Sequence, residues 1–293
     1  MIQVINLTKK YDETTALSNL SVDIKPGITG IVGQNGAGKS TLLRIAAGVC
    51  FPTEGSVLIN GNLSDSTKSK ETVFFLPDEP YAPLKSDVNS VFEFYDLFYN
   101  IDKEKYFNLI DLFKLPLNRD ISKFSKGMRR MVFIALALSI NVDILLLDEA
   151  FDGLDPLTLQ TVKEQIVKLC DNDTKTVVIS SHNITSLEKF VDRFIILSEG
   201  SFLTDGDIEM MSEKFAKYQA IFDEGTCSQN YLESVGLNVV SYKELGSFVT
   251  FVILKDDNSD KTIKKLHAKH LEEAPIEKEE TLILEMSLAN KEK

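Results

Sequence analysis

The chain has 293 residues, a length that suits one large domain or one domain with an appendage. Hydrophobic residues make up 43% and charged residues 26%, which is typical of globular proteins with a substantial core. The net charge of −12 argues against a nucleic acid partner held by general electrostatics, because neutralising phosphates requires clustered Lys and Arg. Three widely separated cysteines (Cys50, Cys170 and Cys227) indicate neither a disulfide framework nor zinc.

The first part of the chain reads as strands, and a helical stretch follows. Strand patterns cover Ile2–Leu7, Leu17–Ile24, Ile28–Gly33 and Gly55–Gly61. From Asp87 to Ile140 the apolar spacing is helical, which predicts a helical subdomain over about residues 80–140. Within it, the aromatic run Val91–Asn100 favours a helical core stripe over a docking surface for a membrane partner.

After the helical stretch, strand patterns return over Asp143–Ala150, Thr176–His182 and Phe194–Gly200. Helical segments after the first two predict the βαβ rhythm of a parallel sheet. We therefore expect an α/β fold with a P-loop NTPase core, an N-terminal antiparallel part and a helical insertion.

GQNGAGKST, Gly33–Thr41, fits the phosphate-binding pattern G-x-x-x-x-G-K-[ST], the Walker A motif, between a predicted strand and a predicted helix. Glycines let the backbone N–H groups point inward at phosphate oxygens, and the helix adds its positive N-terminus. Lys39 is expected to reach the β and γ phosphates and Ser40 to ligate Mg²⁺. The predicted nucleotide-binding residues are Gly33, Asn35, Gly36, Gly38, Lys39, Ser40 and Thr41.

A second site signal is DILLLDEA, an apolar strand that ends in two carboxylates. Asp148 is expected to hold Mg²⁺, directly or through water, beside the phosphate loop. Glu149 is expected to orient and activate the water that attacks the γ-phosphate.

In this order the motifs resemble the ATPase subunit of an ABC transporter over about residues 2–206. FSKGMRR, Phe124–Arg130, is similar to the family signature L-S-G-G-Q, with Lys126 for glycine and Met128 for glutamine. The resemblance implies that Ser125 and Gly127 touch the γ-phosphate of ATP bound to a second subunit. A helix N-terminus that offers a hydroxyl and N–H groups suits that role.

The resemblance also assigns roles to single residues. AFDGLDP resembles the D-loop, so Asp155 is expected at the dimer interface, and His182 resembles the switch histidine that contacts the γ-phosphate. Tyr11 resembles the aromatic residue that stacks on adenine. Asp78 stands where the family usually has glutamine. Aspartate is still expected to meet Mg²⁺ or its water, but because it is shorter and charged, the coupling role of this loop is favoured over the detailed metal contact.

Residues 207–293 carry none of these motifs and are expected to form an accessory domain. The predicted order is βαββαβ, which fits a small ferredoxin-like sandwich, with a helix over Asp260–Leu271 and a last strand over Thr281–Leu288. His267 and His270 lie three apart on that helix, where a solvated face is favoured over a metal pair. Regulation, dimer support and partner contact all remain open as its role.

The resemblance implies a hydrolytic ATPase that uses ATP and Mg²⁺ and powers export through a separate membrane permease by ATP-driven closure of a dimer. The second subunit is either identical or a paralogue, and the face near Asp78–Lys85 is the expected docking site for the permease. The SKGM signature, Asp78 and the C-terminal extension resemble bacterial exporters of drugs, peptides or lipids.

The main alternative is a soluble ABC mechanoenzyme that acts on DNA or ribosomes. The short stretch between the phosphate loop and the signature leaves no room for a long coiled coil, and the chain holds a single cassette. A GTPase is disfavoured because no N-K-x-D motif stands in a sensible position. Without a signal peptide or an apolar run long enough to span a bilayer, we expect a cytoplasmic chain at the inner face of the cell membrane.

Overall fold

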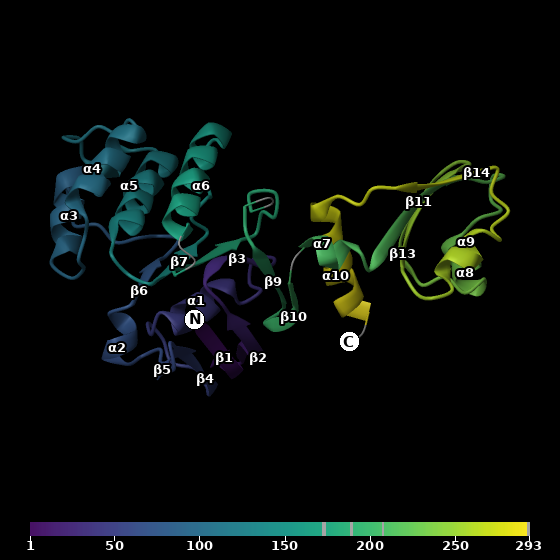
Figure 1. Cartoon of the computed structure of the whole chain (residues 1–293), viewed down its shortest axis with the longest axis horizontal. Coiled ribbons are helices and arrows are strands. Elements are labelled where there is room, and N and C mark those ends of the chain that lie inside the picture. The colour runs from purple at the N-terminus through teal and green to yellow at the C-terminus, as the bar shows by residue number, and fades with distance from the viewer. Residues whose placement is uncertain (172–173, 188–189, 207, 292–293) are drawn as a thin grey trace. The chain divides into compact units, whose positions relative to one another are not determined.

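The structure, a computed structural model, describes residues 1–171, 174–187, 190–206 and 208–291. It consists of two compact units, Met1–Phe202 and Leu203–Lys293 (Figure 1). Residue 207, where the accessory domain is expected to begin, lies outside the described residues, and the boundary between the predicted domains stays a prediction.

An antiparallel sheet forms the N-terminal part of the first unit, as predicted. Its strand order is β2-β1-β4-β5, and Ile2 of β1 lies opposite both Ile24 of β2 and Ile59 of β4. Alternate apolar side chains of these strands are buried, which gives the sheet its single apolar face. The strands are β1 (Ile2–Tyr11), β2 (Thr14–Ile24), β4 (Glu54–Ile59) and β5 (Asn62–Leu63).

The central sheet has the order β10-β9-β3-β8-β7-β6. Strand β3 pairs in parallel with β8 and β9, and β7 pairs in parallel with β6 and β8, which confirms the predicted parallel sheet. Every residue of β7 and β8 is buried, so these strands read as continuous apolar runs rather than alternating ones. The strands are β3 (Gly27–Val32), β6 (Val73–Leu76), β7 (Ile144–Asp148), β8 (Thr176–Ser181), β9 (Arg193–Ser198) and β10 (Ser201–Gly206).

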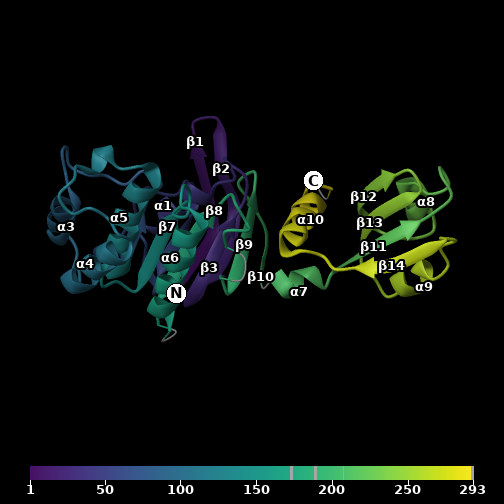
Figure 2. The same ribbon diagram turned by 90° about the horizontal axis from the view of Figure 1, so that it is seen from above.

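Helices α3 (Val88–Asp96), α4 (Lys103–Leu112) and α5 (Lys126–Ser139) group together beside the sheet in both ribbon views (Figures 1 and 2). Helix α5 is buried over its whole C-terminal part, as its apolar sequence predicts. The aromatic run is divided, because Phe92 is buried whereas Phe98 is exposed. The other helices of this unit are α1 (Lys39–Ala46), α2 (Thr67–Lys70), α6 (Pro156–Cys170) and the 3₁₀ turn η1 (Ile121–Lys123).

The second unit contains a four-stranded antiparallel sheet in the order β12-β13-β11-β14. Between α7 (Ile208–Ser212) and α10 (Lys278–Lys291), its elements follow the predicted βαββαβ order. Helices α8 and α9 cover one face of the sheet around Phe251, and α10 covers the other around Val252. The elements are β11 (Phe215–Ile221), α8 (Gln229–Ser234), β12 (Val239–Leu245), β13 (Phe248–Leu254), α9 (Ser259–Ile263) and β14 (His270–Ala274).

Two expectations for this unit are wrong. The last strand is His270–Ala274, paired with β11, whereas Thr281–Leu288 lies within helix α10. Leu284 and Leu288 are one helical turn apart, so both lie on the face of α10 that packs against the sheet. His267 lies in a loop and His270 on β14, so the two histidines share no helical face. Among the described residues, no group of three or more His, Cys, Asp or Glu is suited to a metal ion.

None of the helices in the described part of the chain combines the length and the apolarity that crossing a bilayer requires.

Candidate functional site

The phosphate-binding loop joins β3 to α1, as predicted. Gly38 precedes the first residue of α1 with a φ of 98°, and a Cβ there would lie 2.5 Å from the carbonyl oxygen of Ala16, so only glycine fits. Helix α1 has no side-chain cap and no acidic residue in its first turn. Its N-terminal N–H groups are therefore available to an anion, which the helix dipole also favours.

Lys39 lies inside the curl of this loop, with only 5% of its side chain exposed. Its ammonium donates to the carbonyl oxygens of Gly33 and Gln34 at 2.8 and 3.2 Å. The same ammonium lies 3.3 Å from a carboxylate oxygen of Glu149. The loop thus concentrates one positive charge where a phosphate would enter.

Ser40 and Asp148 meet at the end of β7. The Ser40 hydroxyl donates to Asp148 Oδ1 at 3.0 Å, and the Ser180 hydroxyl donates to the same oxygen at 2.6 Å. Asp148 is buried, and hydroxyl and carboxylate oxygens are ligands that Mg²⁺ accepts. Ser40 and Asp148 therefore fit the predicted Mg²⁺ role.

The three predicted catalytic residues converge. One carboxylate oxygen of Glu149 lies 3.3 Å from the Lys39 ammonium, and the other lies 2.9 Å from Nδ1 of His182. Glu149 has a φ of 46°, an uncommon value for a residue with a side chain, and its N–H donates to the Ser180 hydroxyl at 2.9 Å. A carboxylate held in this way is oriented to accept a proton from a nearby water.

The signature segment begins α5. Ser125 is the N-cap, and its hydroxyl accepts the N–H of Met128 at 3.1 Å, so the methionine in place of glutamine leaves the cap intact. A Cβ on Gly127 would lie 2.6 Å from the carbonyl oxygen of Gly153. Glycine is therefore required where the signature packs on the D-loop of the same chain.

Asp155 caps α6 by accepting the N–H groups of Leu157 and Thr158, each at 3.1 Å. Hydrogen bonds from the Thr158 hydroxyl and backbone lower the pKa of Asp155, so it is ionised at neutral pH. Its carboxylate is exposed, as a residue at a subunit interface would be in an isolated chain.

Tyr11 ends β1, and its ring is 43% exposed. The Lys9 ammonium lies 4.8 Å from the ring centroid, and the hydroxyl lies 3.8 Å from the sulfur of Cys50. Partial burial is the main cause that raises the pKa of Tyr11, so the phenol is neutral at physiological pH. An exposed aromatic ring near the end of α1 suits the predicted stacking on adenine.

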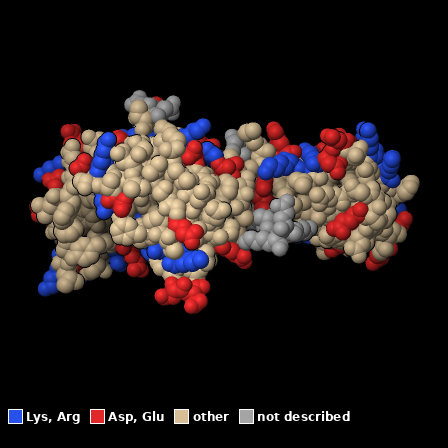
Figure 3. Space-filling model, turned by 90° about the horizontal axis from the view of Figure 1, so that it is seen from below, with Lys and Arg blue, Asp and Glu red and all other residues tan. Residues whose placement is uncertain are grey.

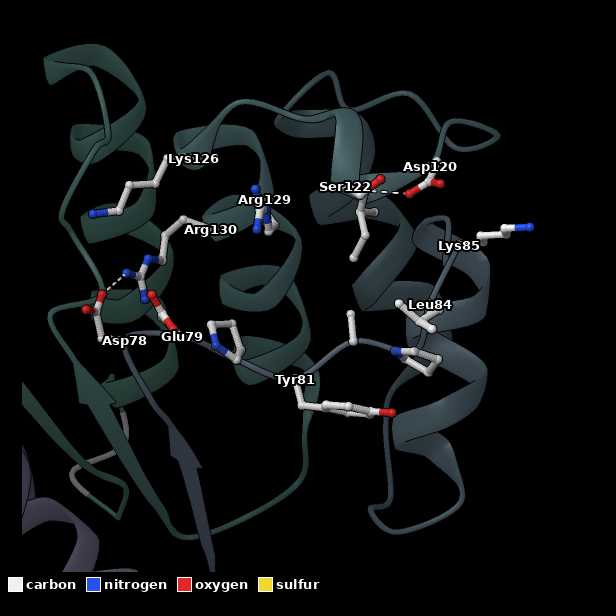
Figure 4. Close-up of a pocket in the computed structure, with 14 residues that line it drawn as sticks. Asp78, Glu79, Tyr81, Leu84, Lys85, Asp120, Ser122, Lys126, Arg129 and Arg130 are labelled. Carbon is white, nitrogen blue, oxygen red and sulfur yellow. Dashed lines mark hydrogen bonds and ion pairs between the residues drawn. The ribbon is translucent and has the colours of Figure 1, made fainter.

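Asp78 has a protein partner, and its predicted contact with Mg²⁺ stays a prediction. Its carboxylate forms an ion pair with Arg130 of α5 (Figure 4), and the described contacts do not join it to Ser40 or Asp148. Arg130 also donates to the carbonyl oxygen of Pro77 at 3.3 Å. The loop after β6 is thus tied to the signature helix.

Sequence reasoning missed Ser180 and Arg130. Ser180 lies beside Asp148 because β7 and β8 are parallel neighbours in that register. The signal for it was a hydroxyl at the end of a strand predicted to lie in the same sheet. Arg130 is a buried charge on a helix, and no local pattern marks its partner.

Comparisons with known proteins agree with this site. Residues 17–152 match the family described as ABC transporter. Over 76% of its length the chain is 32% identical to the uncharacterized ABC transporter ATP-binding protein MJ1023 of Methanocaldococcus jannaschii, covering 84% of that protein. It is 26% identical, over 97% of both chains, to the ABC transporter ATP-binding protein YtrB of Bacillus subtilis.

A solved structure, the dimeric bacterial ABC transporter cassette MJ0796, superposes with a TM-score of 0.64 at 28% identity. The match covers 71% of this chain and 98% of that one. The fold, the ordered motifs and these relatives lead to one conclusion. The chain belongs to the family of ABC transporter ATP-binding proteins and is an ATPase.

Proposed function

We propose that this chain powers export through a separate membrane permease by closing, with ATP bound, on a second ATPase subunit. The observation that carries the proposal is the convergence of Lys39, Glu149 and His182 at 3.3 and 2.9 Å beside the phosphate-binding loop. A cation, a carboxylate and an imidazole are the groups that γ-phosphate binding and attack by water require.

In the proposed reaction, the phosphates of ATP take the place of the loop carbonyls and of Glu149 around the Lys39 ammonium. Mg²⁺, held by Ser40 and Asp148, would neutralise charge on the phosphate oxygens. Water then attacks the γ-phosphorus, the bond to the bridging oxygen of ADP breaks, and Glu149 receives the water proton. His182, which already contacts Glu149, orients the γ-phosphate.

Ser125, Gly127 and Asp155 are proposed to complete the site of the second subunit. Ser125 and Asp155 are exposed in the single chain, which leaves both available to a partner. A second copy of this chain or a paralogue would present the same motifs. The related cassette MJ0796 is a dimer in its solved structure, which supports this arrangement.

A pocket of about 710 Å³ is the proposed docking site for the permease. It lies between the loop Asp78–Lys85 and the start of α5, with Tyr81 below it and Leu84 to its right in Figure 4. Leu84 is 97% exposed and Tyr81 is 64% exposed, so both side chains are accessible to a partner that would cover them. Docking there would place the chain at the inner face of the cell membrane.

The direct test is Glu149→Gln in the full-length chain. The amide cannot accept the water proton, so hydrolysis is expected to fall by roughly a thousandfold while ATP binding persists. Turnover is measured by phosphate release and occupancy by retained radiolabelled ATP. Unchanged turnover would refute the assignment of Glu149.

The transporter role has its own test, because the alternative is a soluble mechanoenzyme on DNA or ribosomes. Purification from solubilised membranes is expected to recover an integral membrane permease with this chain, whereas recovery with ribosomes alone would contradict the proposal. On the face drawn in Figure 3, Lys and Arg are scattered among Asp and Glu, a distribution that gives little support to a nucleic acid partner.

A further inference from the structure

Two ion pairs join the first turns of α5 to two different loops. Lys126 binds Asp152 of the D-loop at 2.5 Å, and Arg130 binds Asp78 of the loop after β6. Lys126 and Arg130 are four residues apart, so they lie on one side of the helix, one turn apart. Figure 4 shows both side chains extending from α5 toward the side where Asp78 lies.

The two loops leave the central sheet side by side. Strands β6 and β7 are parallel, with Leu76 opposite Leu147. Asp78 and Glu149 each follow one residue of this pair by two positions, just beyond the ends of their strands. Helix α5 therefore contacts both loops that follow these two strands, through Asp78 and Asp152.

The D-loop, which Lys126 contacts through Asp152, is hydrogen-bonded to the candidate base Glu149. The N–H of Asp152 donates to the carbonyl oxygen of Glu149 at 3.1 Å, which closes a tight turn directly after the base. The same turn packs on Gly127, where a Cβ would lie 2.6 Å from the Gly153 carbonyl oxygen. The turn thus links the backbone of Glu149 to the residue that pairs with Lys126.

We propose that Lys126 and Arg130 are positioning residues that hold the turn after Glu149 and the loop after β6 against the signature helix. Both cations stand outside the reacting groups and act through Asp152 and Asp78. The inference rests on the proposed role of Glu149 as the base and adds the contacts that keep it in place.

The pKa shifts of Lys126 and Asp152 agree with the ion pair between them. The hydrogen bond from Lys126 lowers the pKa of Asp152, with smaller contributions from the charges of His182 and Arg130. The same bond raises the pKa of Lys126, and Asp78 adds to the effect. The Lys126–Asp152 pair is largely exposed, and such pairs contribute little to folding stability. Removing it should therefore change the geometry of the site without unfolding the chain.

The test compares Lys126→Ala, Asp152→Ala and the double variant in steady-state ATP hydrolysis by the full-length chain. Each single variant is expected to lower kcat about tenfold with KM for ATP nearly unchanged, because small misplacements of catalytic groups are costly. The double variant is expected to be no slower than either single one, and the exchange Lys126→Asp with Asp152→Lys is expected to recover most of kcat. Lys123→Ala, which removes an exposed lysine just before α5, is the matched control.

A normal kcat for Asp152→Ala beside a slow Lys126→Ala would overturn the proposal, since Lys126 would then act without its partner, for example on nucleotide held by a second subunit. Independent, multiplying effects of the two single variants would overturn it as well. Thermal midpoints equal to that of the wild type show that each variant is folded. If Glu149→Gln keeps its turnover, it is the assignment of the base that fails, and the two failures are distinguishable.

The second pair is tested by Asp78→Asn against Asp78→Ala. The amide oxygen of asparagine still accepts a hydrogen bond from Arg130, so Asp78→Asn should keep most of kcat whereas Asp78→Ala should lose it. A metal-binding role would need the negative charge, and both variants would then be slow and would need more Mg²⁺. That second pattern would contradict the positioning role of Arg130.

Discussion

The two units of this chain use their polar residues differently. In the first unit, Lys39, Asp148 and Ser180 are buried at or near the ends of parallel strands. Lys39 pairs with Glu149, and Ser180 donates to Asp148, each across a long sequence distance. In the second unit, Lys214 and Lys217 of the β11 region form ion pairs with Glu285 and Glu280 of α10. Clustering of buried charges around a phosphate-binding loop marks a site, whereas ion pairs between a sheet and its covering helix mark packing.

The largest expected effect that tests this difference is on nucleotide binding. Lys39→Ala removes the one cation that lies within the loop, so affinity for a fluorescent ATP analogue should fall by roughly ten- to a hundredfold, the loss expected for a charge-assisted hydrogen bond. Lys214→Ala removes a lysine paired with Glu285 in the second unit and should leave the affinity unchanged. Equal losses in both variants would show that the comparison between the units is wrong.

A core substitution in the second unit is expected to lower its free energy of unfolding without changing ATP hydrolysis. Leu284 is 3% exposed and packs with Phe215, Val240 and Val252, so Leu284→Ala should destabilise this unit by about 2–5 kcal/mol. Denaturant unfolding of the full chain measures the loss, with Ile283→Ala on the exposed side of α10 as the matched control. ATP hydrolysis should be preserved as long as the first unit stays folded. A large loss of kcat at a temperature where both units are folded would show that the second unit contributes to ATP hydrolysis, and would contradict the comparison.

The smallest effect concerns a helix cap in the first unit, away from the site. Asp87 caps α3 by accepting the N–H of Ser90 at 2.8 Å, and Asp87→Ala should cost about 1 kcal/mol at neutral pH. The backbone and hydroxyl hydrogen bonds from Ser90 lower the pKa of Asp87 in the folded chain. Its stabilisation is therefore present above the unfolded pKa and is lost as the pH falls through the folded pKa.

Asp87→Asn is the control for the predicted pH dependence of the Asp87 cap. Asp87→Asn keeps an acceptor oxygen but has no proton to gain, so its stability should approach that of the wild type at neutral pH without the loss on acidification. Thermal midpoints between pH 7 and pH 3 measure both variants. An identical pH profile for the wild type and Asp87→Asn would contradict the cap assignment.

Asp78 shows what a structure adds to a family pattern. The sequence favours a coupling role for its loop over a detailed metal contact, and no local pattern indicates a protein partner for its carboxylate. The structure joins Asp78 to Arg130, a residue 52 positions away that is 3% exposed. A buried arginine requires a partner, and that requirement becomes visible only when the helix and the loop are placed together.

Features that depend on local backbone conformation and spacing could be predicted from the amino-acid sequence. The phosphate-binding loop turns at Gly38 with a φ of 98°, the start of the helix at Ser125 has a capping hydroxyl, and the apolar run before Asp148 forms a buried strand. Each of these features involves residues close together in the chain, so the pattern predicts the structure directly.

Features that depend on packing between distant segments emerged only from the three-dimensional arrangement. Ser180 meets Asp148 through strand register, and His270–Ala274 becomes the last strand because it pairs with β11. Thr281–Leu288 lies within α10, and its Leu284 packs with Phe215, Val240 and Val252 on one face of that sheet. Side-chain pairing and burial across a sheet override local propensity, and neither is encoded in spacing along one segment.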